Sequence, residues 1–161
     1  MTKAKTGSRL TAMLWVAAVL WVGVLFFLST QTAVQSDELS GWFTSLVLRV
    51  FRFLKYDPSD LEGVLRKVAH FCIFAFEGFL LGLAMQRTIK KRTKALILTE
   101  AICMVMAAAN EASQLFAAGR SCEVRDMLID SGGALLGVFA AWALHAIVLA
   151  AVSDQRSVEW L

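Results

Sequence analysis

The sequence predicts an all-α membrane protein, a four-transmembrane-helix bundle with an outer-face amphipathic helix between the first and second spans. Two observations lead to this fold class. Hydrophobic residues make up 58% of the 161 residues, which is more than a soluble domain normally carries. These residues are also gathered into stretches that approach the roughly 20 apolar residues needed to cross a bilayer. We therefore expect a single membrane domain over residues 1–161.

The predicted spans cover about residues 10–28, 68–86, 95–116 and 127–151. The first span resembles a signal peptide, but it is too long and lacks an obvious small-residue cleavage site, so we expect it to be retained. Before the second span, Asp57 and Pro58 are typical of a helix N-cap and of the first helical position. The second membrane helix is therefore predicted to begin there.

The segment between the first two spans has an amphipathic pattern of its own. Large apolar residues recur at helical spacing from Phe43 to Leu54, while polar residues such as Ser45 fall on another face. We interpret this stretch as a helix that lies on the outer leaflet. A lid packed on the bundle, without lipid contact, is the alternative.

Basic residues in short loops predict how the chain is oriented in the membrane. Five of them lie between Arg87 and Lys94, in the tight loop that joins the second and third spans, and three more precede the first span. Such clusters stay in the cytoplasm, so both termini are predicted to be cytoplasmic. The net charge of +3 is explained by this orientation, and we expect no nucleic-acid partner.

Polar side chains interrupt the apolar pattern of the last three spans. An acid at the centre of a spanning helix costs about 2.5 to 3.5 kcal/mol on insertion scales, so such residues tend to face a polar cavity and to be functional. On the second span, Lys67 and His70 share one helix face, and Glu111 with Gln114 does the same on the third. On the fourth, Asp130 shares its face with Gly133 and Gly137, whose spacing allows another helix to approach closely.

Helical phase and depth place His70, Glu111 and Asp130 at similar levels below the outer boundary. We expect an outward-facing cleft in which these three are the candidate catalytic residues, with His70 or Glu111 available for proton transfer. An anionic head group or a phosphate suits such a cleft. The candidate ligand-binding residues at and around its mouth are Lys67, Gln114, Arg120 and Asp126.

Two other interpretations of these polar residues remain open. Glu111 and Asp130 could pair with Arg120 and Arg125, both expected in the turn between the last two spans, and merely close that turn. A metal ion on His70, Glu111 and Asp130 is conceivable, but the same residue types form plain salt-bridge networks. We expect no metal and no other cofactor.

The three cysteines, Cys72, Cys103 and Cys122, show none of the spacings that are typical of a structural zinc site. Cys72 and Cys122 are both expected near the outer surface. A disulfide between them is an alternative if that side of the membrane is oxidising.

Two blocks of sequence resemble the VanZ-like family of small bacterial membrane proteins. They are RKVAHFCIFAFEGFLLG at residues 66–82 and NEASQLFAAGRSCEVRDMLIDSGGALLG at residues 110–137, and FLSTQ after the first span fits a further element of the family. The resemblance covers roughly three quarters of the chain and implies that the family's polar set falls on Lys67, His70, Glu111, Gln114, Arg120, Asp126 and Asp130. Asn110 and Ser113 depart from the family, because many members have an aspartate and a histidine there. These departures argue against a mechanism that needs the second histidine or the extra acid, and against a metal.

The family is named after a member associated with resistance to the lipoglycopeptide teicoplanin. The resemblance therefore implies a protein of the bacterial cytoplasmic membrane that acts at its outer face on a membrane lipid or a lipid-linked envelope precursor. Whether the protein is an enzyme stays open. The alternatives are a non-catalytic binding protein that shields against a glycopeptide antibiotic, and a small transporter that would have to form a homodimer.

Overall fold

The computed structural model describes residues 2–30, 58–116 and 122–158. Within them lie four helices, α1 (Thr2–Ser29), α3 (Pro58–Thr88), α4 (Arg92–Gln114) and α5 (Val124–Val158). Each contains a stretch that is long and apolar enough to cross a membrane: Gly7–Ser29, Gly63–Thr88, Arg92–Gln114 and Val124–Ala150. The all-α, four-span fold class is confirmed. The predicted amphipathic helix from Phe43 to Leu54 lies outside the described residues.

The ends of the helices differ from the predicted spans in an informative way. α3 begins at Pro58, as the capping pattern predicts, but α1 and α5 continue well past the apolar runs that define their spans. Hydropathy marks where a helix is apolar, whereas backbone hydrogen bonding continues until a residue or a turn ends it. Arg125 is a correction: it lies in the first turn of α5 and not in the turn before it. Arg120, the other arginine expected in that turn, lies outside the described residues.

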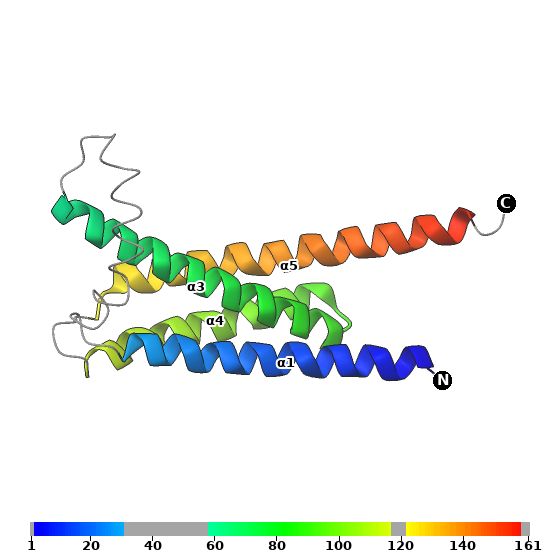
Figure 1. The fold of residues 1–161 in the computed structure, drawn as a ribbon, viewed down its shortest axis with the longest axis horizontal. Coiled ribbons are helices and arrows are strands. Elements are labelled where there is room, and N and C mark those ends of the chain that lie inside the picture. The colour runs from blue at the N-terminus through cyan, green and yellow to red at the C-terminus, as the bar shows by residue number, and fades with distance from the viewer. Residues whose placement is uncertain (1, 31–57, 117–121, 159–161) are drawn as a thin grey trace.

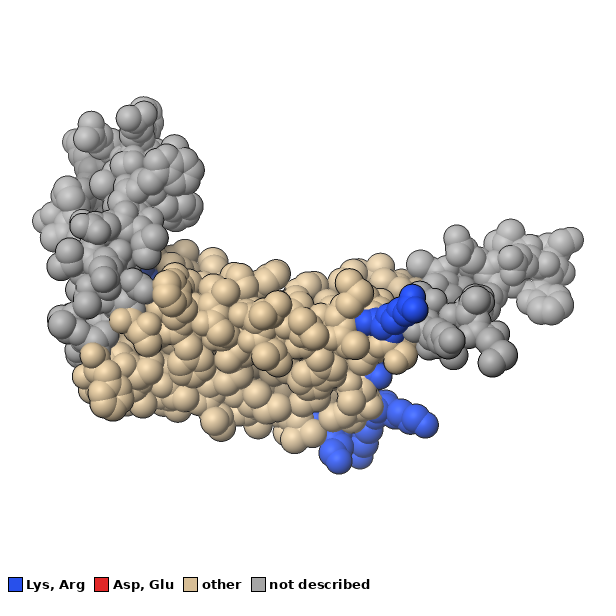
Figure 2. Space-filling view, turned by 60° about the horizontal axis from the view of Figure 1, so that its bottom comes forward, with Lys and Arg blue, Asp and Glu red and all other residues tan. Residues whose placement is uncertain are grey.

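The helices run back and forth, so the start of α1, the end of α5 and the α3–α4 connection lie at the same end of the molecule (Figure 1). We call it the basic end, because it carries the exposed residues Arg9, Arg87, Lys90, Lys91, Arg92 and Lys94. On the face of the molecule that Figure 2 shows, the Lys and Arg side chains gather mainly at this end. The last turn of α1, the last turn of α4 and the first turn of α5 lie at the opposite end.

Glycines bring α3 and α5 into backbone contact. A Cβ atom added to Gly133 would overlap the carbonyl oxygen of Phe71, and one added to Gly137 would overlap the carbonyl oxygen of Ala75. From the other side, a Cβ atom on Gly78 of α3 would overlap the carbonyl oxygen of Ala134. Small residues at such positions allow two membrane helices to pack closely. This contact fixes the register of α3 against α5 and thus decides which polar residues face one another.

α1 is attached to α3 through an aromatic residue. The Trp21 indole N–H donates a hydrogen bond of 3.1 Å to the backbone oxygen of Ile73. Its ring also meets Phe76 edge to face, with the ring centroids 4.7 Å apart. Tryptophan combines a large apolar surface with one donor that needs a partner when it is buried.

The three cysteines, Cys72, Cys103 and Cys122, are free.

The orientation in the membrane stays a prediction, and two exposed positions at opposite ends of the bundle test it. In a chain with Cys72→Ala and Cys103→Ala, we expect a membrane-impermeant maleimide added to intact cells to label the exposed Cys122. The same reagent should not label Thr93→Cys in a chain that lacks all three native cysteines. Thr93 is exposed at the basic end, which is predicted to face the cytoplasm. Labelling at position 93 without labelling at Cys122 would reverse the predicted topology.

Candidate functional site

One polar cluster in the bundle draws residues from three helices. His70 of α3, Glu111 of α4 and Asp130 of α5 each offer a nitrogen or carboxylate oxygen, and these atoms all lie within 4.8 Å of one another. Glu111 and Asp130 are fully buried, while 17% of the His70 side chain is exposed. We call these residues the three-helix cluster. The structure thus brings the three candidate catalytic residues together.

The close contact of α3 with α5 explains why His70 faces Asp130. Phe71, the neighbour of His70, touches Gly133, and Gly133 lies one turn after Asp130 on α5. With a larger residue at position 133, the two helices could not approach to this distance. The Asp130 Oδ1 atom lies 3.3 Å from His70 Nδ1. This contact involves only Nδ1, so it does not engage Nε2, the other nitrogen of the imidazole ring.

Glu111 is held in place by hydrogen-bond donors to both of its carboxylate oxygens. Oε1 accepts a bond of 2.8 Å from the Gln114 side-chain amide, and Oε2 accepts one of 3.0 Å from the backbone N–H of Glu123. The second bond joins the last turns of α4 to the residue just before α5. Gln114 was a candidate ligand-binding residue, and the structure shows that its buried amide contacts Glu111.

Asp130 has a different environment, because His70 Nδ1 lies beside it but neither of its oxygens forms a hydrogen bond of good geometry with the described residues. The buried Oδ1 atoms of Asn110 and Asp126 also have no hydrogen-bond donor among these residues. No Lys or Arg in the described part of the chain forms an ion pair with Glu111 or Asp130. The interpretation that Arg125 pairs with these acids to close the turn is not supported, since Arg125 is exposed on α5.

The remaining predicted residues lie around the cluster or outside the described chain. Lys67 is half-buried on α3, one turn before His70, and Asp126 is half-buried on α5, one turn before Asp130. No described contact joins Lys67 to the acids. Arg120 falls in residues 117–121, which the structure does not describe.

Serines at the end of α1 and on α4 support the cluster and were not predicted to do so. The hydroxyl of the buried Ser29 donates a hydrogen bond of 3.3 Å to the backbone oxygen of Asn110 and lies 2.9 Å from the Ser113 hydroxyl. Ser113 also donates a bond of 2.7 Å to the Asn110 backbone oxygen. The one sign in the sequence is that Ser29 belongs to the FLSTQ element after the first span, and this element does not indicate its partner.

A second pair of acids, the buried Glu77 and the half-buried Glu100, lies toward the middle of the bundle. Glu77 is 1% exposed, and neither of its oxygens has a hydrogen-bond partner within the described ranges. Glu77 and Glu100 both lie near the buried Cys103. Two helical turns, or about 10 Å, separate Glu77 from His70 along α3, and about three turns separate Glu100 from Glu111 along α4, so these acids are not part of the three-helix cluster.

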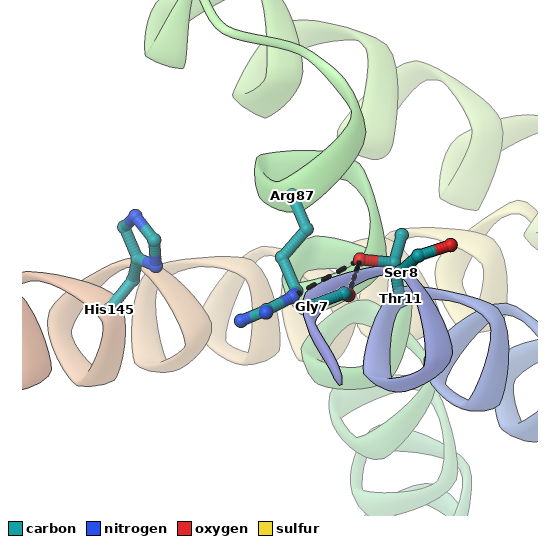
Figure 3. A pocket seen from close by; sticks show the side chains of 5 residues that line it. All are labelled: Gly7, Ser8, Thr11, Arg87 and His145. Carbon is teal, nitrogen blue, oxygen red and sulfur yellow. Dashed lines mark hydrogen bonds between the residues drawn. The ribbon is translucent and has the colours of Figure 1, made fainter. Parts of the chain in front are cut away.

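At the basic end, an open pocket lies between α1, α3 and α5, lined by Gly7, Ser8, Thr11, Arg87 and His145 (Figure 3). The Arg87 Nε–H donates to the Thr11 hydroxyl at 3.3 Å, and that hydroxyl donates to the Gly7 carbonyl oxygen at 2.9 Å. His145 is half-buried and points into this pocket from α5. The chain's two histidines therefore lie at opposite ends of the bundle.

The fold and the cluster define a class of protein: a polytopic α-helical membrane protein with a polar site enclosed by three of its spans. A family model described as VanZ/LLP1 matches residues 14–147, a range that contains the whole three-helix cluster. The chain belongs to the VanZ/LLP1 family. No curated protein and no solved structure matches the chain.

Proposed function

We propose that this protein acts at the outer face of the bacterial cytoplasmic membrane on a cell-envelope lipid or a lipid-linked ligand, through the three-helix cluster. The observation that carries the proposal is the enclosure of an imidazole and two carboxylates among three membrane helices. Buried acids are expensive in a bilayer and tend to mark functional sites. The basic end favours the cytoplasm by the charge rule, which leaves the cluster near the outer leaflet.

The chemistry of the cluster supports work on a head group. His70 is its only partly exposed member, so it is the first side chain that an incoming group would meet. Asp130 beside Nδ1 orients the ring and leaves Nε2 for proton transfer. Two donors fix the position of the Glu111 carboxylate, which suits a group that positions a ligand or accepts a proton in a set direction. Lys67, one turn nearer the end of the bundle, and Arg120 are the cations that we assign to a phosphate.

The same site would account for a role in teicoplanin resistance, which the family resemblance implies. A protein that modifies, moves or covers an envelope lipid at the outer leaflet would alter the surface on which a lipidated glycopeptide acts. Binding without catalysis would need the cations and the cluster's shape, whereas catalysis would also need His70 and Glu111 to exchange protons.

A binding measurement on the purified protein tests the lipid proposal. With native mass spectrometry, we expect undecaprenyl phosphate to bind in preference to phosphatidylcholine, which has no net charge. Lys67→Met should weaken this binding about ten-fold or more, because a hydrogen bond to a charged group contributes roughly 1.5 to 3 kcal/mol. Lys90→Met is the matched control, since Lys90 is exposed at the basic end. Equal binding of both lipids, or equal loss in both variants, would contradict the proposal.

A further inference from the structure

The three-helix cluster has more buried hydrogen-bond acceptors than donors. Glu111 has a donor for each oxygen. Asp130 lies beside His70 Nδ1, 3.3 Å from its Oδ1 atom, and beside the Asn110 side chain, but neither of its oxygens forms a hydrogen bond of good geometry with the described residues. The neighbouring Oδ1 atoms of Asn110 and Asp126 have no donor among those residues. Asp130 is 0% and Asn110 2% exposed, so water at the surface does not replace the missing donors. An unsatisfied buried acceptor costs roughly 1 to 3 kcal/mol, and more when it is charged. A group of this composition is stabilised by a cation.

The positions of the acceptors suit a divalent cation. The ligand atoms of His70, Glu111 and Asp130 lie within 4.8 Å of one another and come from three different helices. Ligands of one cation with bonds of about 2.0 to 2.2 Å lie about 2.8 to 3.6 Å apart when they are adjacent, and about 4.0 to 4.4 Å apart only when they are on opposite sides. Inward shifts of less than about 1 Å per side chain would therefore bring all three atoms to bonding distance.

Glu111 also has the outer contacts that metal-ligating carboxylates usually have. Its bonds from Gln114 and from the Glu123 backbone fix the direction of the carboxylate, while each oxygen keeps a second lone pair. The contact of Gly133 with Phe71 keeps Asp130 and His70 at a fixed separation. The candidate ligands are thus held in place by helix packing and by hydrogen bonds from neighbouring residues.

Asn110 and Ser113, the two residues that depart from the family pattern, do not exclude a metal in this geometry. The Ser113 hydroxyl bonds the Asn110 backbone and Ser29, so its side chain is engaged toward α1. A serine at position 113 therefore takes no ligand away from the three-helix cluster. Asn110, in place of an aspartate, has its side chain beside Asp130 and still offers a buried amide oxygen that has no donor among the described residues.

We propose that His70, Glu111 and Asp130 bind one divalent transition-metal cation, Zn²⁺ or Mn²⁺, with the Asn110 amide oxygen as a further ligand. One imidazole nitrogen with several oxygens favours these ions over Ca²⁺, whose ligands are oxygens alone. The inference deepens the proposed function, because the cation would supply positive charge for a phosphate at the mouth of the cluster. Only that last role rests on the proposed function; binding of the cation does not.

The metal content of the purified protein tests this proposal. The chain should be purified in detergent on a tag without histidine, stripped with EDTA, reloaded with ZnCl₂ or MnCl₂, dialysed and analysed for metal. We expect one equivalent per chain for the wild type with at least one of the two ions. His70→Gln and Asp130→Asn should each reduce it to background. His145→Gln, which changes the other histidine, should keep one equivalent.

A second readout keeps the test valid if one variant folds poorly. Added cation should raise the thermal unfolding temperature of the wild type and of His145→Gln, and it should leave that of a folded His70→Gln unchanged, since ligands stabilise only a state that binds them. Wild-type protein that binds neither ion, or a His70→Gln variant that binds as well as wild type, would overturn the proposal. Metal loading without binding of undecaprenyl phosphate would instead contradict the proposed function alone.

Discussion

Replacing Gly137 with leucine should prevent the bundle from assembling correctly. A Cβ atom at this position would overlap the backbone oxygen of Ala75 and lie 2.7 Å from the backbone nitrogen of Phe79. Both are backbone atoms of α3, which cannot turn aside as a flexible side chain can. Overpacking a core with side-chain freedom costs about 1 to 3 kcal/mol, so we expect a loss of more than about 3 kcal/mol here. Thermal unfolding in detergent, followed by circular dichroism, measures the loss.

A glycine in another span provides the matched control. Gly23 of α1 is exposed and has nothing within 4 Å of an added Cβ atom, so Gly23→Leu should leave the unfolding temperature and the membrane abundance near wild type. Equal unfolding temperatures for Gly137→Leu and Gly23→Leu would show that α3 and α5 are not in the contact described here. The α3–α5 register, and with it the facing of His70 and Asp130, would then have to be revised.

Hydropathy and capping were sufficient to predict the architecture. The four apolar runs predict the spans because a bilayer requires about 20 apolar residues for each, whatever the tertiary packing. Pro58 marks the start of α3 because proline fits the first helical position, where its missing N–H is not needed. The far limits of α1 and α5 were not predictable in the same way, since a polar helix can extend beyond the membrane without any hydropathy signal.

The cluster was predictable in its members but not in its hydrogen bonds. Helical phase and depth place His70, Glu111 and Asp130 at one level, and tertiary packing then brings them within 4.8 Å. The backbone N–H of Glu123, which bonds Glu111, carries no residue-type signal at all. The Ser29 contact with Asn110 joins residues 81 positions apart, and no local pattern reports such a distance.

The glycine contact was predicted from the residues of one helix only. Gly133 and Gly137 have the spacing that predicts close approach of another helix, but the sequence does not say which helix. Gly78 and Gly82 of α3 have the same spacing, and they face α5 across the same contact. Two such pairs on different spans are a usable sequence signal for neighbouring helices.

Glu111→Gln should abolish the proposed activity and leave the fold intact. The amide oxygen of the new glutamine can accept the bond from the Glu123 backbone N–H. Its amide nitrogen can then face the Gln114 carboxamide, which needs only to rotate and present its oxygen. Both hydrogen bonds survive, but the charge and the exchangeable proton site are lost. General acid–base groups contribute about 10² to 10⁴ in rate, and a carboxamide supplies none of this.

Glu77→Gln is the control for a buried carboxyl group that lies outside the cluster. It makes the same chemical change on α3, about two turns from His70, at a residue that is also fully buried. Since no role in the cluster is assigned to Glu77, its substitution should keep the proposed activity. The pair therefore separates loss of the cluster's chemistry from the general effect of removing an acid inside the bundle.

The most direct measurement is teicoplanin susceptibility in a sensitive bacterial host that produces each variant, read together with the amount of protein in its membranes. At equal abundance, we expect Glu111→Gln to be as susceptible as cells without the protein, and Glu77→Gln to be as resistant as cells with the wild type. Full resistance with Glu111→Gln at wild-type abundance would contradict the account, because the three-helix cluster would then not be the functional site.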